Sequence, residues 1–108
     1  MKTALLVAGL ILSTGGLLNA AEAKENWGKH CAKCHGMDGK GKTKMGQQSG
    51  AKDYTDPKVQ AELKDDKAVK VIKEGLSENG KKEMVPYAEK LSDDEIKALV
   101  AYIRAFKK

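Results

Sequence analysis

The clearest hydrophobic pattern in the chain lies near its C-terminus and predicts an amphipathic helix. Its apolar positions follow the spacing i, i+3, i+4, i+7 of one helical face, and they are Ile96, Leu99, Val100 and Ile103. Ser92 and Glu95 stand in the arrangement of a capping box at the start of this helix. Tyr102 and Phe106 widen the apolar side. The opposite face carries Lys97, Ala101, Arg104 and Lys108.

A second helical pattern covers residues 25–34. Its shared face carries Trp27, His30, Cys31 and Cys34, again at i, i+3, i+4 and i+7. We expect Trp27 to be a core residue and His30 to be a partly exposed structural one. The C-terminal helix is expected to pack across this first helix near Trp27.

Two shorter helices are predicted in the middle of the chain. Asp56 followed by Pro57 is typical of a helix start, because proline is well suited to the first helical position, and it predicts a helix over residues 57–63. Another helix is expected over residues 67–75, with Asp65 and Asp66 as its cap. The apolar stripe of that helix is Val69, Ile72 and Leu76.

The remaining stretches, residues 36–54 and 77–87, are expected to be loops. The first is punctuated by five glycines, and the second contains Pro86, which excludes helix there and restricts Val85 to an extended conformation. No strand is predicted. The fold class is therefore all-α, with about four short helices in one small domain.

The N-terminal stretch resembles an export signal. Lys2 precedes the apolar run of residues 4–12, and Ala21-Glu22-Ala23 has the small-x-small form of a cleavage site. The run is shorter than the roughly 20 residues that a membrane span needs. We therefore expect a signal peptide at residues 1–23 and a soluble, exported mature domain at residues 24–108, periplasmic in a bacterium and without stable membrane insertion. The alternative is an uncleaved N-terminal anchor.

The chemistry is concentrated in Cys31-Ala32-Lys33-Cys34-His35, which has the form C-x-x-C-H. This pattern indicates covalent attachment of a c-type haem. Two cysteines three residues apart lie on one side of a helical turn, so their thiols can reach two vinyl groups on one porphyrin edge. The histidine that follows is then held beneath the iron as an axial ligand.

Three other uses of this motif fit the chain less well. A disulfide between Cys31 and Cys34 would close a very small loop and restrain little of the unfolded chain. A dithiol redox motif needs a βαβ setting, for which the pattern gives no strands. A zinc ion needs four donors around it, and His30, Cys31, Cys34 and His35 are too crowded along the chain to provide them.

Met84 is the candidate for the second axial ligand. It lies far from the motif along the chain, in a non-helical segment stiffened by Pro86, and can reach the opposite face of the ring. Met37 and Met45 follow His35 too closely to do so. The alternative for Met84 is a core-filling methionine. Tyr54, the aromatic residue of the first loop, either donates a hydrogen bond to a haem propionate or packs in the core.

With these residues the chain resembles a class I cytochrome c over essentially the whole mature length. The resemblance rests on Cys31-x-x-Cys34-His35, the glycine-rich loop that follows, Met84 with a nearby proline, and the helix after Ser92. It implies a compact all-α fold around one haem c per chain, with His35 and Met84 on the iron and electron transfer as the activity. The loop after His35 lacks the proline whose carbonyl many members use to hold the histidine, so another carbonyl is expected there.

The sequence therefore predicts a monomeric one-electron carrier of respiratory or photosynthetic electron transport rather than an enzyme. The alternatives are a haem enzyme or ligand sensor with an open or displaceable sixth position, and a fixed electron-relay subunit of a larger complex. The formal net charge is +5. This charge either steers the chain to acidic surfaces of a redox donor or acceptor or gives a solvated exterior, since carboxylates lie among the lysines. An exported chain without a platform of aromatic residues among its basic ones is not expected to bind nucleic acid.

The covalent cofactor can be tested directly. Denaturing mass spectrometry of the natural product should give the polypeptide mass plus one haem, carried on Cys31 and Cys34. A variant with both cysteines replaced by alanine should lose this adduct. A natural product whose mass is that of the polypeptide alone would end this interpretation.

Overall fold

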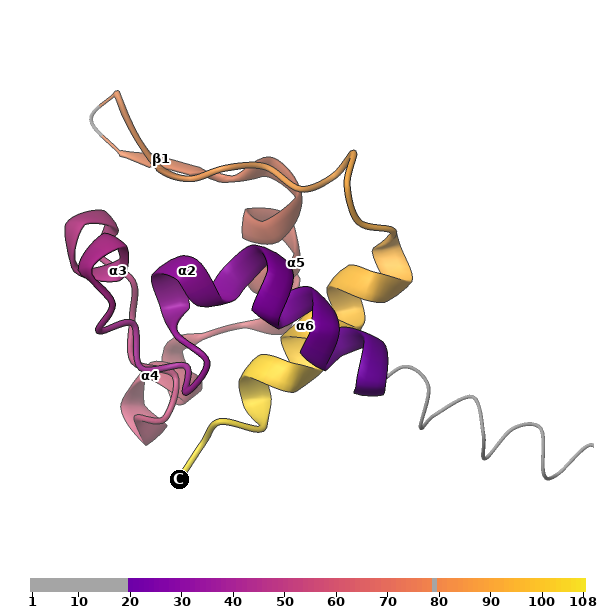
Figure 1. Ribbon diagram of the computed structural model, residues 1–108, viewed down its shortest axis with the longest axis horizontal. Helices are drawn as coiled ribbons and strands as arrows, with labels where there is room; N and C mark the ends of the chain where they lie inside the picture. Colours follow the sequence, from indigo (N-terminus) through magenta and orange to yellow (C-terminus); the bar gives the residue numbers. More distant parts are fainter. Residues whose placement is uncertain (1–19, 79) are drawn as a thin grey trace, which may run out of the picture.

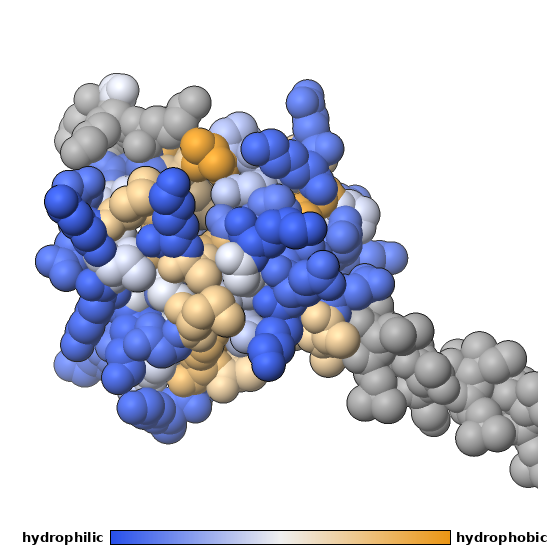
Figure 2. Space-filling view, in the orientation of Figure 1, coloured by the Kyte–Doolittle hydropathy of each residue, from blue (hydrophilic) through white to orange (hydrophobic). Residues whose placement is uncertain are grey.

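The computed structural model describes residues 20–78 and 80–108. Most of the signal peptide predicted at residues 1–23 lies outside the described residues. The described part is mostly helical and is arranged around an apolar core (Figure 1). The surface view in Figure 2 is largely hydrophilic, with smaller apolar areas between the charged side chains.

The first helix is longer than expected and contains one π-helical turn. Residues 20–26 are helical, the π turn η1 spans Trp27–Cys31, and α2 spans Ala32–His35. In the π turn the N–H of Ala32 donates to the carbonyl oxygen of Trp27. Along this helix Trp27 is buried, whereas Cys31 and Cys34 are half-buried.

A short helix, α3 (Lys44–Ser49), lies in a stretch that the sequence analysis describes as a loop. That expectation was wrong because Thr43 caps the helix by accepting a hydrogen bond from the N–H of Gly46, and Gly50 ends it in a left-handed conformation. The hydroxyl of Thr43 also lies 2.7 Å from the carbonyl oxygen of Cys34. Helix α3 is thereby fastened to the C-x-x-C-H turn.

The two central helices form as predicted, with small changes at their ends. Helix α4 spans Pro57–Glu62 and is capped by Asp56, and α5 spans Asp65–Glu74. Ile72 is buried as expected, but Leu76 is 41% exposed. The helix stops two residues before Leu76, so this side chain does not continue the apolar stripe.

A β-hairpin occupies much of the second predicted loop. Strand β1 (Leu76–Glu78) pairs antiparallel with β2 (Lys81–Met84), and Leu76 lies opposite Met84. The absence of strands was therefore a wrong prediction. The signal was present in the sequence, since Asn-Gly between two short runs is typical of a hairpin turn.

Helix α6 (Asp93–Arg104) closes the core. Its capping box is confirmed, with Ser92 and Glu95 each accepting a hydrogen bond from the other's backbone N–H. The four apolar positions of this helix, Ile96, Leu99, Val100 and Ile103, are all buried. The helix packs against the first helix, where the rings of Tyr102 and Trp27 are 5.6 Å apart. No helix within the described ranges has the length and apolar character to cross a membrane.

The packing of α3 on the C-x-x-C-H turn predicts a steric penalty at Gly46. A Cβ atom at this position would lie 2.1 Å from the carbonyl oxygen of Cys34. The Gly46→Ala variant should lose roughly 1–3 kcal/mol of unfolding free energy, measured by chemical denaturation of the haem-loaded protein, because α3 must move away. Gly28→Ala is the matched control, since its Cβ would meet nothing closer than 3.8 Å in a helix. Equal stability of the two variants would contradict the packing described.

Candidate functional site

Cys31 and Cys34 lie at the end of the π turn and within α2, and both are free, half-buried thiols. Burial, with a smaller contribution from Cys34, raises the pKa of Cys31 from 9.0 to about 11. The Cys31 thiol is therefore protonated at neutral pH. A dithiol redox centre depends on a thiolate with a lowered pKa, so this environment disfavours that use of the pair.

His35 ends α2 and lies between two aromatic rings. The Tyr54 ring stacks on the imidazole at a centroid distance of 5.4 Å, and the Trp27 ring lies 5.6 Å away. Burial lowers the pKa of His35, which favours the neutral imidazole that binds metals. The buried Nδ1 of His35 has no hydrogen-bond partner. The expectation that some carbonyl would hold this nitrogen was therefore wrong.

Trp27 connects this site to the core, as predicted. The residue is 1% exposed, and its indole N–H donates to the carbonyl oxygen of Gly36 at 2.9 Å. Its ring also packs against Phe106 at 5.1 Å. Trp27, the largest side chain in the core, thus fixes the turn that follows His35.

Met84 is the last residue of β2 and packs, half-buried, against the apolar core. The same core is contacted by Cys31, Tyr54 and Tyr87. The methionines near His35 have a different environment, since Met37 is 56% exposed and Met45 is 41% exposed. Of these three methionines, Met84 is the one that packs on the core, which Cys31 of the cysteine motif also contacts.

Tyr87 connects the segment around Met84, residues 84–87, to the first helix, which carries Cys31 and Cys34. Its hydroxyl donates to the carbonyl oxygen of His30 at 2.9 Å, and its backbone N–H donates to the carbonyl oxygen of Ile72 in α5. Burial, followed by the effects of Cys31 and Cys34, raises the pKa of Tyr87. This segment is therefore hydrogen-bonded both to α5 and to the first helix. His30 is partly exposed, as expected, and its ring packs edge-on against the Tyr87 ring at 5.4 Å.

Tyr54 packs against the imidazole of His35 with a half-buried ring. Burial, and then the charge of Cys31, raise the pKa of the Tyr54 phenol. Of the two roles expected for Tyr54, packing is therefore confirmed. A hydrogen bond from its hydroxyl to a propionate stays a prediction.

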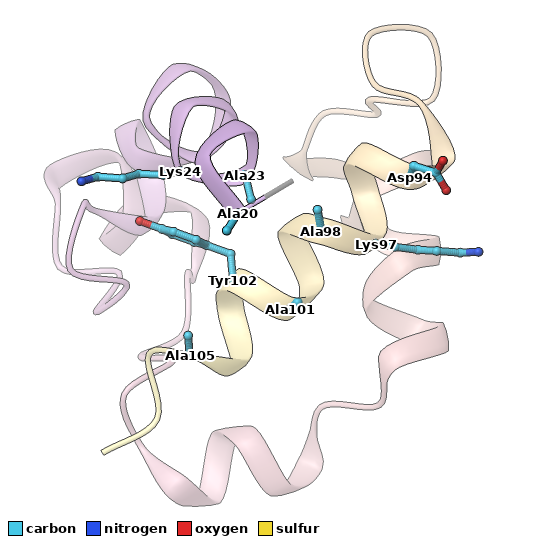
Figure 3. A pocket seen from close by; sticks show the side chains of 9 residues that line it. All are labelled: Ala20, Ala23, Lys24, Asp94, Lys97, Ala98, Ala101, Tyr102 and Ala105. Carbon is cyan, nitrogen blue, oxygen red and sulfur yellow. The ribbon is translucent and has the colours of Figure 1, made fainter. Parts of the chain in front are cut away.

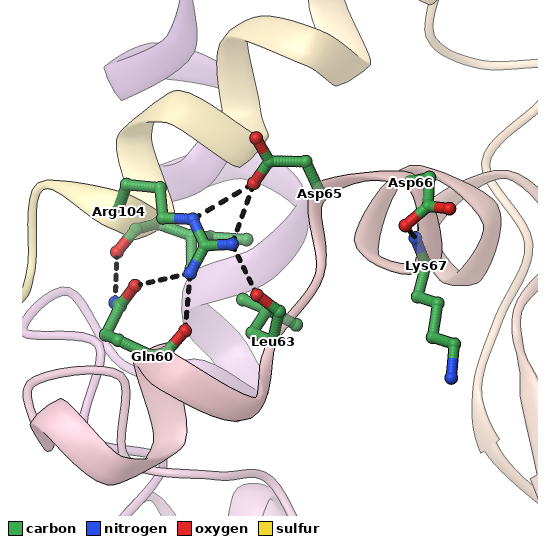
Figure 4. Close-up of polar contacts among 7 residues, drawn as sticks. Gln60, Leu63, Asp65, Asp66, Lys67 and Arg104 are labelled. Atoms are coloured by element: carbon green, nitrogen blue, oxygen red, sulfur yellow. Dashed lines mark hydrogen bonds and ion pairs between the residues drawn. The ribbon is translucent and has the colours of Figure 1, made fainter.

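Sequence reasoning missed two residues near the site, Gln60 and Arg104. Arg104 was predicted to lie on the face of the last helix opposite its apolar positions, yet its guanidinium donates to the carbonyl oxygen of Gln60 and to Asp65 (Figure 4). Gln60 donates in turn to the carbonyl oxygen of Tyr54. A polar residue in a short polar helix gives no periodic signal, so Gln60 could not be recognised from the pattern. The partners of Arg104 lie about forty residues away in sequence, so its position on the helix did not indicate them.

An open groove lies on another part of the molecule, between residues 20–24 and α6 (Figure 3). Its lining is mainly alanine, with Lys24, Asp94, Lys97 and Tyr102 around it. None of the residues predicted to hold the haem lines this groove. It is therefore not part of the candidate site.

Comparison with known proteins identifies the family. Residues 18–103 match the family described as cytochrome c oxidase, cbb3-type, subunit III. The solved structure of the KustC0563 c-type cytochrome is 38% identical, with a TM-score of 0.69, and the match covers 80% of this chain and 98% of that one. The chain belongs to the c-type cytochromes. A single-residue variant of KustC0563 matches with 36% identity and the same TM-score, covering 80% of this cytochrome and 99% of the variant. A search of the curated proteins found no match.

The residues present fit the haem that the family implies. Two free thiols lie on one helical segment, and a neutral imidazole that packs against two aromatic rings follows them. A thioether from a distant strand borders the same core. The cytochrome has the mostly helical class I fold, with a small hairpin added, and haem-based electron transfer is the activity of its family.

The anchoring of the Met84 segment by Tyr87 can be tested by removing one oxygen atom. Tyr87→Phe should cost about 1 kcal/mol of unfolding free energy, because the hydrogen bond to His30 is lost. It should also speed the binding of added imidazole to the ferric cytochrome, since the segment opens more often. Tyr102→Phe is the matched control, because that hydroxyl does not contact the segment. Equal binding rates in the two variants would show that Tyr87 does not restrain Met84.

Proposed function

We propose that this cytochrome is a one-electron carrier with one haem c bound through Cys31 and Cys34 and ligated by His35 and Met84. The observation that carries the proposal is that Cys31 and Met84 pack on one core built around Trp27, and that the His35 ring lies 5.6 Å from the Trp27 ring. They come from two segments about fifty residues apart, which Tyr87 links through its hydrogen bond to His30.

The chain's own groups define how the site would work. A haem c iron held between a histidine and a methionine supplies a one-electron ferric and ferrous couple, with a potential raised by the thioether. His35 is neutral because it is buried, and the rings of Trp27 and Tyr54 restrict its movement. Met84 is restricted by the hairpin and by Tyr87. Side chains that move little between the two oxidation states favour fast electron exchange.

This arrangement favours a carrier over the haem enzyme or ligand sensor. With His35 and Met84 both on the iron, no coordination position is left for a substrate or a gas. A sensor or enzyme would require Met84 to be absent from the iron or readily displaced. The anchoring of the Met84 segment to α5 and to His30 argues against easy displacement.

The distribution of charge supports an acidic redox partner. Residues 33–52, which surround His35 and α3, carry five lysines and one aspartate, whereas the chain as a whole has a net charge of +5. Residues 33–52 therefore carry an excess of positive charge beside the cysteine motif, as residues 97–108 do at the C-terminal end. A donor or acceptor with an acidic surface would be attracted to this side, and the attraction would weaken as salt is added. We propose that the carrier is a monomer. We propose that it has no nucleic-acid partner.

The proposed setting is outside the cytoplasm, with residues 24–108 as the working domain after removal of the signal peptide at residues 1–23. The chemistry of Cys31 and Cys34 agrees with this, because a c-type haem is attached after export.

A second candidate is a fixed electron relay inside a larger complex. The description of the matching family, a subunit of a cbb3-type oxidase, favours this candidate. Size-exclusion chromatography of a native extract, followed by absorbance of the haem, separates the two. A carrier should elute at the size of one small domain, whereas a relay subunit should elute with a complex many times larger.

The ligand set is tested by a redox titration with spectra on the exported protein and its Met84→Ala variant. Ferric wild type should show the weak sulfur-to-iron band, and the ferrous form should resist carbon monoxide. Met84→Ala should lose the band, bind carbon monoxide and have a lower potential, because the thioether that favours ferrous iron is gone. Met37→Ala and Met45→Ala are the controls, since both side chains are exposed. Carbon monoxide binding by the wild type would support a sensor or an enzyme instead.

A further inference from the structure

Gln60 is a buried polar side chain whose amide atoms all have partners. The residue is 4% exposed. Its Nε2 donates to the carbonyl oxygen of Tyr54 at 2.7 Å and to that of Ile103 at 2.8 Å. Its Oε1 accepts from Nη1 of Arg104 at 3.1 Å. This orientation of the amide pairs each donor with an acceptor. Gln60 therefore joins the segment that carries Tyr54 to the end of α6.

Arg104 holds Gln60 and is itself held by Asp65 (Figure 4). Nη1 of Arg104 donates to the main-chain oxygen of Gln60 at 2.7 Å, while Nε and Nη2 donate to Oδ1 of Asp65 at 3.0 and 2.8 Å. Nη2 also donates to the carbonyl oxygen of Leu63. A guanidinium presents its donors in a rigid planar fork, so these contacts fix its position. We call Gln60, Arg104 and Asp65 the Gln60 clamp.

The Gln60 clamp holds the backbone carbonyl of Tyr54, and the glycine-rich loop holds its backbone N–H. The N–H of Tyr54 donates to the carbonyl oxygen of Gly39 at 2.8 Å, and its own carbonyl oxygen accepts from Gln60. The ring of Tyr54 is then nearly parallel to the imidazole of His35, with 26° between the two planes. The position of the backbone thus determines how the ring meets the imidazole.

His35 depends on this stacking more than a metal ligand ordinarily does. A ligating histidine usually donates from its second ring nitrogen to an acceptor, which fixes the orientation of the ring. Nδ1 of His35 is buried and has no such partner. Rotation of the imidazole is therefore limited by the aromatic rings of Tyr54 and Trp27 that pack on it.

The geometry points to Gln60 and Arg104 as positioning residues of the haem site, which set the orientation of the His35 imidazole by fixing the Tyr54 ring against it. The inference rests on the proposed function, because it requires His35 to be an axial ligand. The orientation of an axial imidazole determines how its orbitals overlap with those of the iron. A change in the clamp is therefore expected to alter the electronic structure of the ferric site.

The test compares variants of the haem-loaded protein by proton NMR of the ferric form, in which the spread of the haem methyl resonances reports the plane of the axial imidazole. Gln60→Met keeps the side-chain length and removes the donors to Tyr54 and Ile103. Arg104→Lys keeps the charge and removes the fork. Both should change the spread of the methyl resonances and shift the reduction potential. Tyr54→Leu should change the spread as well, whereas Tyr54→Phe should preserve it because the stacked ring remains.

Ser92→Ala is the control for stability, because it removes the capping box of α6 without touching Tyr54. It should lower the melting temperature and leave the methyl resonances unchanged. The inference is overturned if Gln60→Met and Arg104→Lys behave like this control. If Gln60→Met does not fold, Arg104→Lys alone decides. A His35→Gly variant whose ferric spectrum matches the wild type would instead refute the proposed function, so the two failures are distinguishable.

Discussion

The burial of Trp27 is the interaction on which the rest of the structure depends. Its indole fills the space between the first helix and α6, where it packs against Tyr102 and Phe106. The same ring contacts the imidazole of His35, and its N–H holds the carbonyl of Gly36. One side chain therefore supplies both the centre of the core and a wall of the site. A chain of this size buries a smaller fraction of its surface than a larger protein does, so one side chain that serves both the core and the site matters more here.

The sequence predicted most of the helical framework, because long amphipathic segments with clear caps carry a strong local signal. The helix that begins after Ser92 formed with its capping box and its buried face. The short elements were missed. Helix α3 is six residues long and depends on Thr43, whose hydroxyl also contacts the cysteine helix, so its stability is partly tertiary. The hairpin has strands of three and four residues, too short for an alternating pattern to stand out.

The candidate site could be predicted where function needs a fixed order of residues and not where packing alone decides. Cys31, Cys34 and His35 follow a strict spacing that chemistry imposes, and Met84 could be selected by its distance along the chain. The surroundings of these residues obey no such rule. Arg104 reaches Gln60 across more than forty residues of sequence, Gln60 in turn holds the carbonyl of Tyr54, and the unpartnered Nδ1 of His35 results from the whole arrangement. Such contacts arise from tertiary geometry, which a single sequence does not encode in any local pattern.

The backbone of the hairpin that ends at Met84 is sterically crowded at its root, Gly75, and open at its tip, Gly80. At the root, a Cβ atom on Gly75 would lie 2.6 Å from the carbonyl oxygen of Met84, and the backbone there has a positive φ of 80°. At the tip, a Cβ atom on Gly80 would meet nothing within 4 Å. Changes in length are therefore absorbed at the tip, while the root keeps the sulfur in its place. Side chains at the tip can therefore change the outline of the molecule without moving the backbone of Met84.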